Sequence, residues 1–201
     1  MLLDTPVTVF LLVLNGLIGA YTLFVDPSLV GKWAFRPYVV RQRREMGRWL
    51  TAGFVHVGVG HLAFNLITLY FFGPLIEGVL GPVRFLMVYL GSDLAANALT
   101  FWRHRGDPNY SAVGASGAIS GVLFSFVLFA PFELLYVFFA IPMPAIVFAV
   151  LYVVLSIYAS KQGGGRIAHE AHLGGALGGL VLTIALYPAA VTIFLRQLGL
   201  G

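Results

Sequence analysis

The chain has 201 residues, of which 59% are hydrophobic and 10% are charged, and its mean hydropathy is +0.91. Soluble domains are about 45–50% apolar and about 25% charged, so this composition excludes a soluble globular protein and indicates a membrane protein. The absence of cysteine excludes disulfides and thiolate metal sites, and we assign the formal net charge of +4 to loops facing lipid headgroups and not to nucleic-acid binding.

Apolar segments occupy most of the chain, and a helix of roughly 20 such residues crosses the hydrocarbon core of a bilayer. The predicted spans are residues 7–25, 57–76, 85–102, 114–130, 145–160 and 169–195. Pro188 is predicted to kink the last of them. We therefore expect an all-α membrane protein, a bundle of six transmembrane helices that forms a single domain over residues 1–201.

The connections between these spans differ in composition. Residues 26–55 form a long basic and aromatic loop, which favours the bilayer interface. Residues 131–144 contain three prolines and are expected to be an apolar connection lying against the interface. Residues 161–166 include three consecutive glycines and predict a flexible loop. The start of the chain lacks the basic residues of a signal peptide, so we expect the first apolar run to be a retained helix.

A serine flanked by glycines, in the segment Gly114-Ala115-Ser116-Gly117, begins the fourth span. Glycines allow a tight backbone and let another group approach the hydroxyl closely. The free N–H groups at a helix N-terminus can also receive a developing oxyanion. The segment therefore predicts Ser116 as a nucleophile. The alternative is a packing role, because Gly114, Gly117 and Gly121 form a small-residue stripe suited to close helix contact.

A histidine, His172, begins the last span and is the candidate base. A serine hydroxyl is a weak nucleophile that needs a positioned base, and histidine is the usual one near neutral pH. Two overlapping GxxxG pairs follow within residues 174–179. We expect this small-residue face to pack against the glycines near Ser116 and to bring His172 within hydrogen-bond reach of the hydroxyl.

Two further polar residues, His61 and Asn65, share one face of the second span because they are four residues apart. Both can donate hydrogen bonds, so they are candidates for stabilising the oxyanion of a tetrahedral intermediate. A buried polar pair that holds two helices together is the alternative. His56, five residues before His61, need not face the site and is expected to be a supporting, structural residue. His169 and His172 are three residues apart and not four as in HExxH, so no metal and no cofactor are predicted.

The ordered set of these motifs resembles the rhomboid family of intramembrane serine proteases, over nearly the whole chain. The resemblance is carried by Arg48-Trp49, His56…His61…Asn65, Glu77-Gly78, Gly114-Ala115-Ser116-Gly117 and Ala171-His172-Leu173-Gly174-Gly175. It implies a rhomboid-like bundle with Ser116 as nucleophile and His172 as general base, a dyad without a third, acidic member. It also implies an oxyanion hole made of His61, Asn65 and the backbone N–H of Ser116.

The resemblance implies a hydrolase that cuts peptide bonds in or near the transmembrane segments of single-pass membrane proteins. We expect it to be an integral multi-pass protein of the cell membrane. One alternative is an inactive rhomboid-like protein that binds or escorts membrane clients. Another is a proton-relay transporter, which would need more charged residues inside the bundle than Asp93.

The chain departs from the family pattern in two ways. Family members often carry an aromatic residue one turn after the nucleophile, stacked on the catalytic histidine, whereas this chain has Ser120 there. The family topology also places the most basic loops of this chain outside, whereas the positive-inside rule predicts the inverted orientation.

Overall fold

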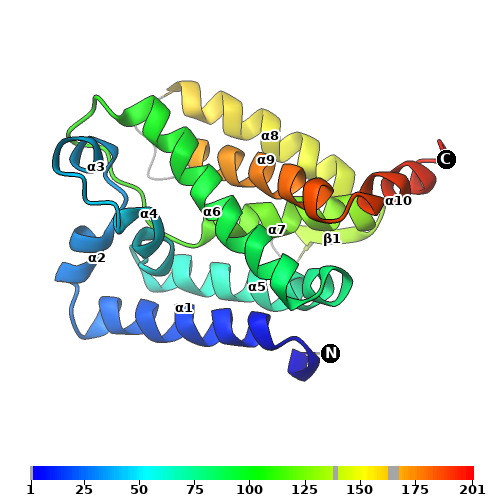
Figure 1. Cartoon of the computed structure of the whole chain (residues 1–201), viewed down its shortest axis with the longest axis horizontal. Helices are drawn as coiled ribbons and strands as arrows, with labels where there is room; N and C mark the ends of the chain where they lie inside the picture. The colour runs from blue at the N-terminus through cyan, green and yellow to red at the C-terminus, as the bar shows by residue number, and fades with distance from the viewer. Residues whose placement is uncertain (1, 138–139, 163–167) are drawn as a thin grey trace.

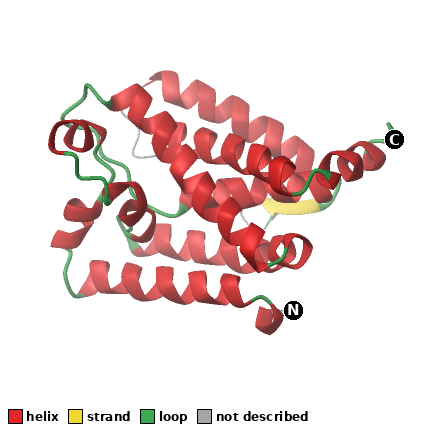
Figure 2. Ribbon diagram, in the orientation of Figure 1, coloured by secondary structure: helices red, strands yellow, loops and turns green. Residues whose placement is uncertain are grey.

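The computed structural model describes residues 2–137, 140–162 and 168–201 (Figure 1). Its helices are η1 (Leu2–Asp4), α1 (Pro6–Phe24), α2 (Ser28–Trp33), α3 (Pro37–Arg43), α4 (Arg48–Thr51), η2 (Ala52–Phe54), α5 (Val59–Leu80), α6 (Pro82–His104), α7 (Ser116–Phe129), α8 (Ala145–Gln162), α9 (His169–Leu186) and α10 (Ala189–Gln197). Two short strands, β1 (Leu134–Val137) and β2 (Ile141–Pro144), form one antiparallel pair (Figure 2). Most of the predicted glycine loop at 161–166 lies outside the described residues.

Three helices, α6, α7 and α9, form the centre of the molecule, with α1 and α5 packed on one side and α8 on the other (Figure 1). Helix α7 is buried along nearly all of its length. The outer helices α1, α5 and α8 expose many large apolar side chains, including Leu17, Phe64 and Leu155. An exposed apolar surface of this extent suits lipid and not water.

Helix α9 packs against both of its central neighbours through glycine. A Cβ atom placed on Gly175 or Gly179 would overlap the backbone of Gly117 or Gly121 in α7. The adjacent Gly174 faces α6, where an added Cβ would lie 2.8 Å from the carbonyl oxygen of Ala95. Each GxxxG pair therefore serves a different neighbour, and the close approach that the spacing predicted between α9 and the Ser116 region is observed.

Helix α1 is attached to α5 through a buried carboxylate. Glu77 accepts hydrogen bonds from the backbone N–H groups of Val7 and Thr8, at 2.9 and 2.7 Å, and from the Thr8 hydroxyl at 2.7 Å. These N–H groups lie in the first turn of α1, where no intrahelical acceptor is available and a negative charge is stabilised. Glu77 is thus a structural anchor at the end of α5.

By length and composition, α1 and α5 can cross a membrane, and the α9–α10 pair adds a third candidate if it is taken as one span. Helices α7 and α8 are shorter apolar helices. Helix α6 carries buried polar residues along one face, among them Ser92, Asp93 and Asn97, which lower its hydropathy. The protein is therefore a membrane protein with two or three candidate spans among the described residues, fewer than the six predicted.

The structure differs from the sequence-based expectation in three segments. The last predicted span is two helices that meet at 110°, because Pro188 ends α9 instead of kinking it. The expectation of an all-α chain is wrong at residues 134–137 and 141–144, where extended backbone pairs as β1 and β2 in a segment whose prolines disfavour a helix. The long loop at 26–55 contains α2, α3, α4 and η2.

Candidate active site

The hydroxyl of Ser116 and the imidazole of His172 meet at the first turns of α7 and α9. The Oγ atom of Ser116 lies 2.8 Å from Nε2 of His172, although the two residues are 56 positions apart. When the ring proton is on Nδ1, the hydroxyl donates to Nε2, which is the arrangement in which an imidazole can accept a proton from a serine. The predicted proximity of these two side chains is therefore observed.

The backbone before Ser116 is held from both sides. Phe35 and Ala112 exchange two backbone hydrogen bonds, at 2.8 and 2.9 Å, and the N–H of Gly114 donates to the carbonyl oxygen of Ala52 at 2.9 Å. Gly114 has φ of +110°, a conformation that L side chains rarely adopt. The chain can therefore turn sharply into α7, which begins at Ser116 itself and directs its free N–H groups toward the site.

His61 and Asn65, in the first turns of α5, face this same turn. A Cβ atom placed on Gly114 would lie 2.5 Å from Cε1 and 2.7 Å from Nε2 of His61, and 3.5 Å from Nδ2 of Asn65. Asn65 is 2% exposed, and neither its Nδ2 nor its Oδ1 atom has a hydrogen-bond partner within the described residues. A buried unpaired amide costs about 1–3 kcal/mol, and its Nδ2 is free to donate to an oxygen atom placed beside this turn.

His56, predicted as a supporting residue that need not face the site, contacts His61. Helix α5 begins only at Val59, so His56 lies in the preceding loop and helical angles do not apply to it. Its ring is fully buried and lies edge-on to that of His61, with the centroids 5.1 Å apart. Burial, with a smaller contribution from His61, lowers the pKa of His56 to about 4, so the ring is neutral near pH 7. It supports His61 through packing.

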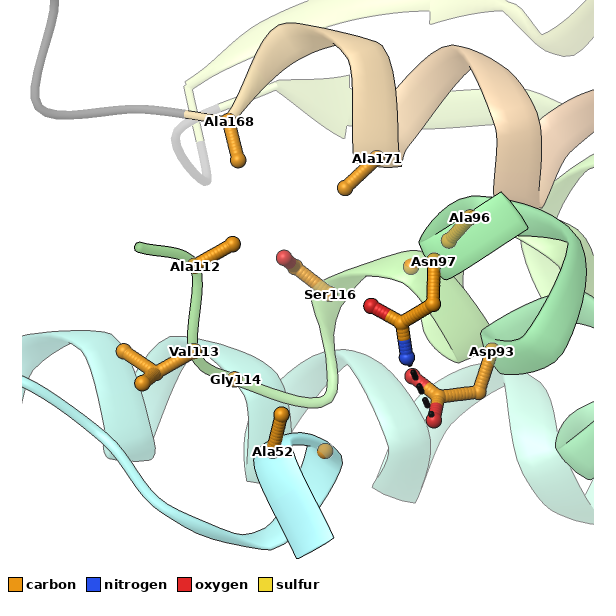
Figure 3. A pocket seen from close by; sticks show the side chains of 12 residues that line it. Ala52, Asp93, Ala96, Asn97, Ala112, Val113, Gly114, Ser116, Ala168 and Ala171 are labelled. Carbon is orange, nitrogen blue, oxygen red and sulfur yellow. Dashed lines mark hydrogen bonds between the residues drawn. The ribbon is translucent and has the colours of Figure 1, made fainter. Parts of the chain in front are cut away.

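A pocket opens beside Ser116 between η2, α6 and the start of α9, and the Ser116 side chain points toward Ala112, Ala168 and Ala171 (Figure 3). Gly117 lies on the same side, where an added Cβ would lie 2.6 Å from the Cβ of Ala96. The missing side chain of Gly117 therefore lets α6 pack closely against the first turn of α7, beside the pocket.

The polar lining of this pocket, Asp93 and Asn97, was not predicted as part of the site. The amide nitrogen of Asn97 donates to the carbonyl oxygen of Trp49 at 2.9 Å and lies 3.5 Å from the Asp93 carboxylate (Figure 3). The signal in the sequence is their i, i+4 spacing on an apolar helix, the same spacing that identified His61 and Asn65.

Within the described residues, no carboxylate contacts the His172 ring as the acidic member of a Ser-His-Asp triad would. Glu170 pairs with Arg103 at 3.0 Å and lies 3.5 Å from His104, and Glu77 is bonded to α1. Among the same residues, the only hydrogen bond of the His172 ring is the one to Ser116. No three His, Cys, Asp or Glu side chains in the described ranges lie together as metal ligands would.

Ser120, one turn after Ser116, is linked to an aromatic residue of α8. Its Oγ donates to the carbonyl oxygen of Ser116 at 2.7 Å and lies 2.5 Å from the hydroxyl of Tyr152. The Tyr152 ring is stacked on His172 with the centroids 6.0 Å apart and the planes at 27°. The sequence gives no local signal for Tyr152, because only the tertiary packing of α8 brings it there.

Residues 43–189, more than half of the chain, match the Rhomboid domain. RHOMBOID-like protein 12, mitochondrial, of Arabidopsis thaliana is 32% identical over 142 residues, which cover 63% of this chain and 42% of that protein. Rhomboid protease GluP of Bacillus subtilis is 38% identical over 79 residues, 39% of this chain and 15% of that protein. The human presenilin-associated rhomboid-like protein, mitochondrial, is 31% identical over 137 residues, 65% of this chain and 35% of that protein. The chain spans less than half the length of these relatives.

Proposed function

Because the chain belongs to the rhomboid family, we propose that it is an intramembrane serine endopeptidase that cuts peptide bonds in or near transmembrane segments of single-pass proteins. The observation that carries this proposal is the 2.8 Å contact between Ser116 Oγ and His172 Nε2. It is supported by the unpaired amide of Asn65 next to the nucleophile and by a relative that is named a rhomboid protease.

In the proposed acylation step, Ser116 Oγ attacks the carbonyl carbon of the substrate while His172 Nε2 takes the hydroxyl proton. The carbonyl oxygen becomes an oxyanion. Donors preorganised for that oxyanion supply the largest part of the stabilisation in such reactions. His61 Nε2, Asn65 Nδ2 and the backbone N–H of Ser116 surround the turn where it would form.

His172 then gives its proton to the leaving amine, and the peptide bond breaks to leave an ester on Ser116. A water molecule must next reach the ester carbonyl, with His172 as its base. The pocket lined by Asp93 and Asn97 is a polar route to that atom in an otherwise apolar bundle. Polar groups within a membrane protein are expected to surround such a water-accessible cavity.

The membrane arrangement belongs to the same proposal. Helices α1, α5, α6, α7, α8 and α9 with α10 would be the six spans of one rhomboid-like domain over residues 1–201, in the cell membrane. Short α7 would then begin below the headgroups, at the floor of the pocket. Backbone that is not helical at membrane depth, such as residues 112–115, is tolerated where it lines a cavity.

Purified protein reconstituted in liposomes with a generic single-span substrate tests the proposal. We expect cleavage by the wild type and none by Ser116→Ala or His172→Ala, while Ser111→Ala, an exposed serine just before the site, cleaves normally. A fluorophosphonate probe should label Ser116 only when His172 is present. If the wild-type protein neither cleaves the substrate nor reacts with the probe, the result would instead support the alternative of an inactive rhomboid-like protein that binds membrane clients.

A further inference from the structure

The orientation of His172 is determined by few contacts. Within the described residues its ring makes one hydrogen bond, to Ser116, and no carboxylate approaches its other nitrogen. A base held at one atom can rotate away from the nucleophile, and a misplacement of about 1 Å can cost on the order of 100-fold in rate. Some other group must therefore hold the plane of the imidazole.

The aromatic ring of Tyr152 is placed to do this. It stacks on His172 at 6.0 Å and 27°, within the offset geometry that aromatic pairs prefer. Two neighbouring rings restrict Tyr152 in turn: Phe148 on α8 and Phe124 on α7 each lie 5.6 Å from it between centroids. The ring is thus fixed on one side by aromatic packing while another side is turned to the base.

The hydroxyl of Tyr152 is fixed as well. Ser120 Oγ uses its single proton to donate to the carbonyl oxygen of Ser116 at 2.7 Å. It can therefore only accept from the Tyr152 hydroxyl, which lies 2.5 Å away. The contacts form a closed circuit that runs from Ser116 through Ser120 and Tyr152 to His172 and returns to the Ser116 hydroxyl.

We propose that Tyr152 is a positioning residue of the dyad: its ring sets the plane of the His172 imidazole, and its hydroxyl bond to Ser120 ties that ring to the first turn of α7. This inference rests on the proposed function. The orientation that an acidic third member gives to histidine in other serine hydrolases is supplied here by stacking.

The test has to separate positioning of the base from two other roles, contact with a membrane substrate and general stability. A small fluorophosphonate probe has no transmembrane segment, so its rate of reaction with Ser116 reports activation of the nucleophile alone. Cleavage of a single-span substrate in liposomes gives kcat and KM, which separate catalysis from substrate binding. The thermal unfolding midpoint shows whether the variant is folded and how stable it is. The matched control is Tyr158→Leu, which removes another tyrosine of α8 that is 62% exposed.

We expect Tyr152→Leu to slow labelling and to lower kcat by on the order of 100-fold, with KM changed little, because the base loses its support. Tyr152→Phe keeps the ring and should restore most of the rate, with about a 5-fold residual loss from the missing hydroxyl bond. Ser120→Ala should cost at least as much as Tyr152→Phe, because it also removes the bond to the Ser116 carbonyl oxygen. The double variant should cost no more than Ser120→Ala alone, since the Ser120–Tyr152 bond can be lost only once. Tyr158→Leu should behave as wild type.

Labelling of Tyr152→Leu at the wild-type rate, with substrate cleavage reduced, would assign Tyr152 to substrate contact and overturn the inference. If Tyr152→Leu does not fold, the labelling rates of Tyr152→Phe and Ser120→Ala test the inference instead. Wild-type labelling in both variants overturns the inference, and so does a double variant whose loss of rate is the sum of the two single losses. A wild type that the probe does not label at Ser116 overturns the proposed function itself, which is a distinguishable result.

Discussion

Gly175 of α9 rests directly on Gly117 of α7, because a Cβ atom placed on Gly175 would overlap the carbonyl oxygen of Gly117. Gly117 follows Ser116, and Gly175 lies about one helical turn after His172. The contact between the two glycines therefore determines how closely the hydroxyl and the imidazole approach, and the observed separation of 2.8 Å depends on it.

Replacing Gly175 by alanine should move α9 away from α7. We expect the free energy of unfolding to fall by about 1–3 kcal/mol from overpacking. Fluorophosphonate labelling of Ser116 should slow by about 10-fold or more as the dyad separates. Leu177→Ala is the control on the same helix, because Leu177 is 50% exposed and its truncation should leave labelling unchanged. Wild-type labelling in Gly175→Ala would show that the dyad geometry does not depend on this contact.

The dyad and its glycine faces could be predicted because their signals are local. Regular GxxxG spacing in residues 174–179 and the glycines around Ser116 determine which helix faces can approach each other. The polar pair His61 and Asn65 stands out on an apolar helix for the same reason. Short-range spacing in the sequence therefore predicted Ser116 and His172 at the centre of the candidate site, and the positions of most helices.

The rest depends on tertiary packing or on where elements begin. Tyr152 reaches His172 only because α8 packs on α7 and α9. Helical spacing between His56 and His61 would apply only if α5 included His56. Helix α5 begins three residues later, at Val59, and His56 faces His61 from the preceding loop. Pro188 can kink a helix or end it, and the local sequence does not distinguish a bend from the observed 110° break.

Asn65→Ala should separate activity from stability. The buried amide has no partner within the described residues, so its removal should leave the free energy of unfolding unchanged or slightly higher. The loss of an oxyanion donor should lower kcat by about 100- to 1,000-fold. Asn97→Ala provides the contrast, because this amide donates to Trp49 at 2.9 Å and its loss should cost about 1–3 kcal/mol. Thermal unfolding of both variants checks this difference, and destabilisation of Asn65→Ala to the level of Asn97→Ala would indicate a packing role.

His56 should make the protein less stable in acid. Its pKa is lowered by burial from 6.5 to about 4 in the folded protein, so between these pH values the unfolded chain binds more protons. The free energy of unfolding should therefore decrease as the pH falls through this range, by at most about 3 kcal/mol from this residue. His56→Phe keeps a ring against His61 but cannot titrate, and its thermal midpoint should change less between about pH 7 and about pH 5. Equal pH dependence in the two proteins would mean that His56 is not the group responsible.

Gly114→Ala should strongly reduce activity through a specific clash. The added Cβ would lie 2.5 Å from Cε1 of His61, so either the His61 ring or the turn before Ser116 must move. We expect labelling of Ser116 to slow by about 100-fold, because the donors and the nucleophile lose their alignment.

Strain alone could also explain such a loss, and the chain contains a control for it. Gly81 has φ of +80° and open space around it, so Gly81→Ala adds left-handed strain without a clash, at about 1–3 kcal/mol. Gly106, with nothing within 4 Å, controls for the substitution itself. We expect Gly81→Ala to lose stability but keep its labelling rate, and Gly106→Ala to lose neither. If Gly114→Ala is labelled as fast as Gly81→Ala, then His61 is not confined against this turn, and its proposed contact with the oxyanion loses its structural basis.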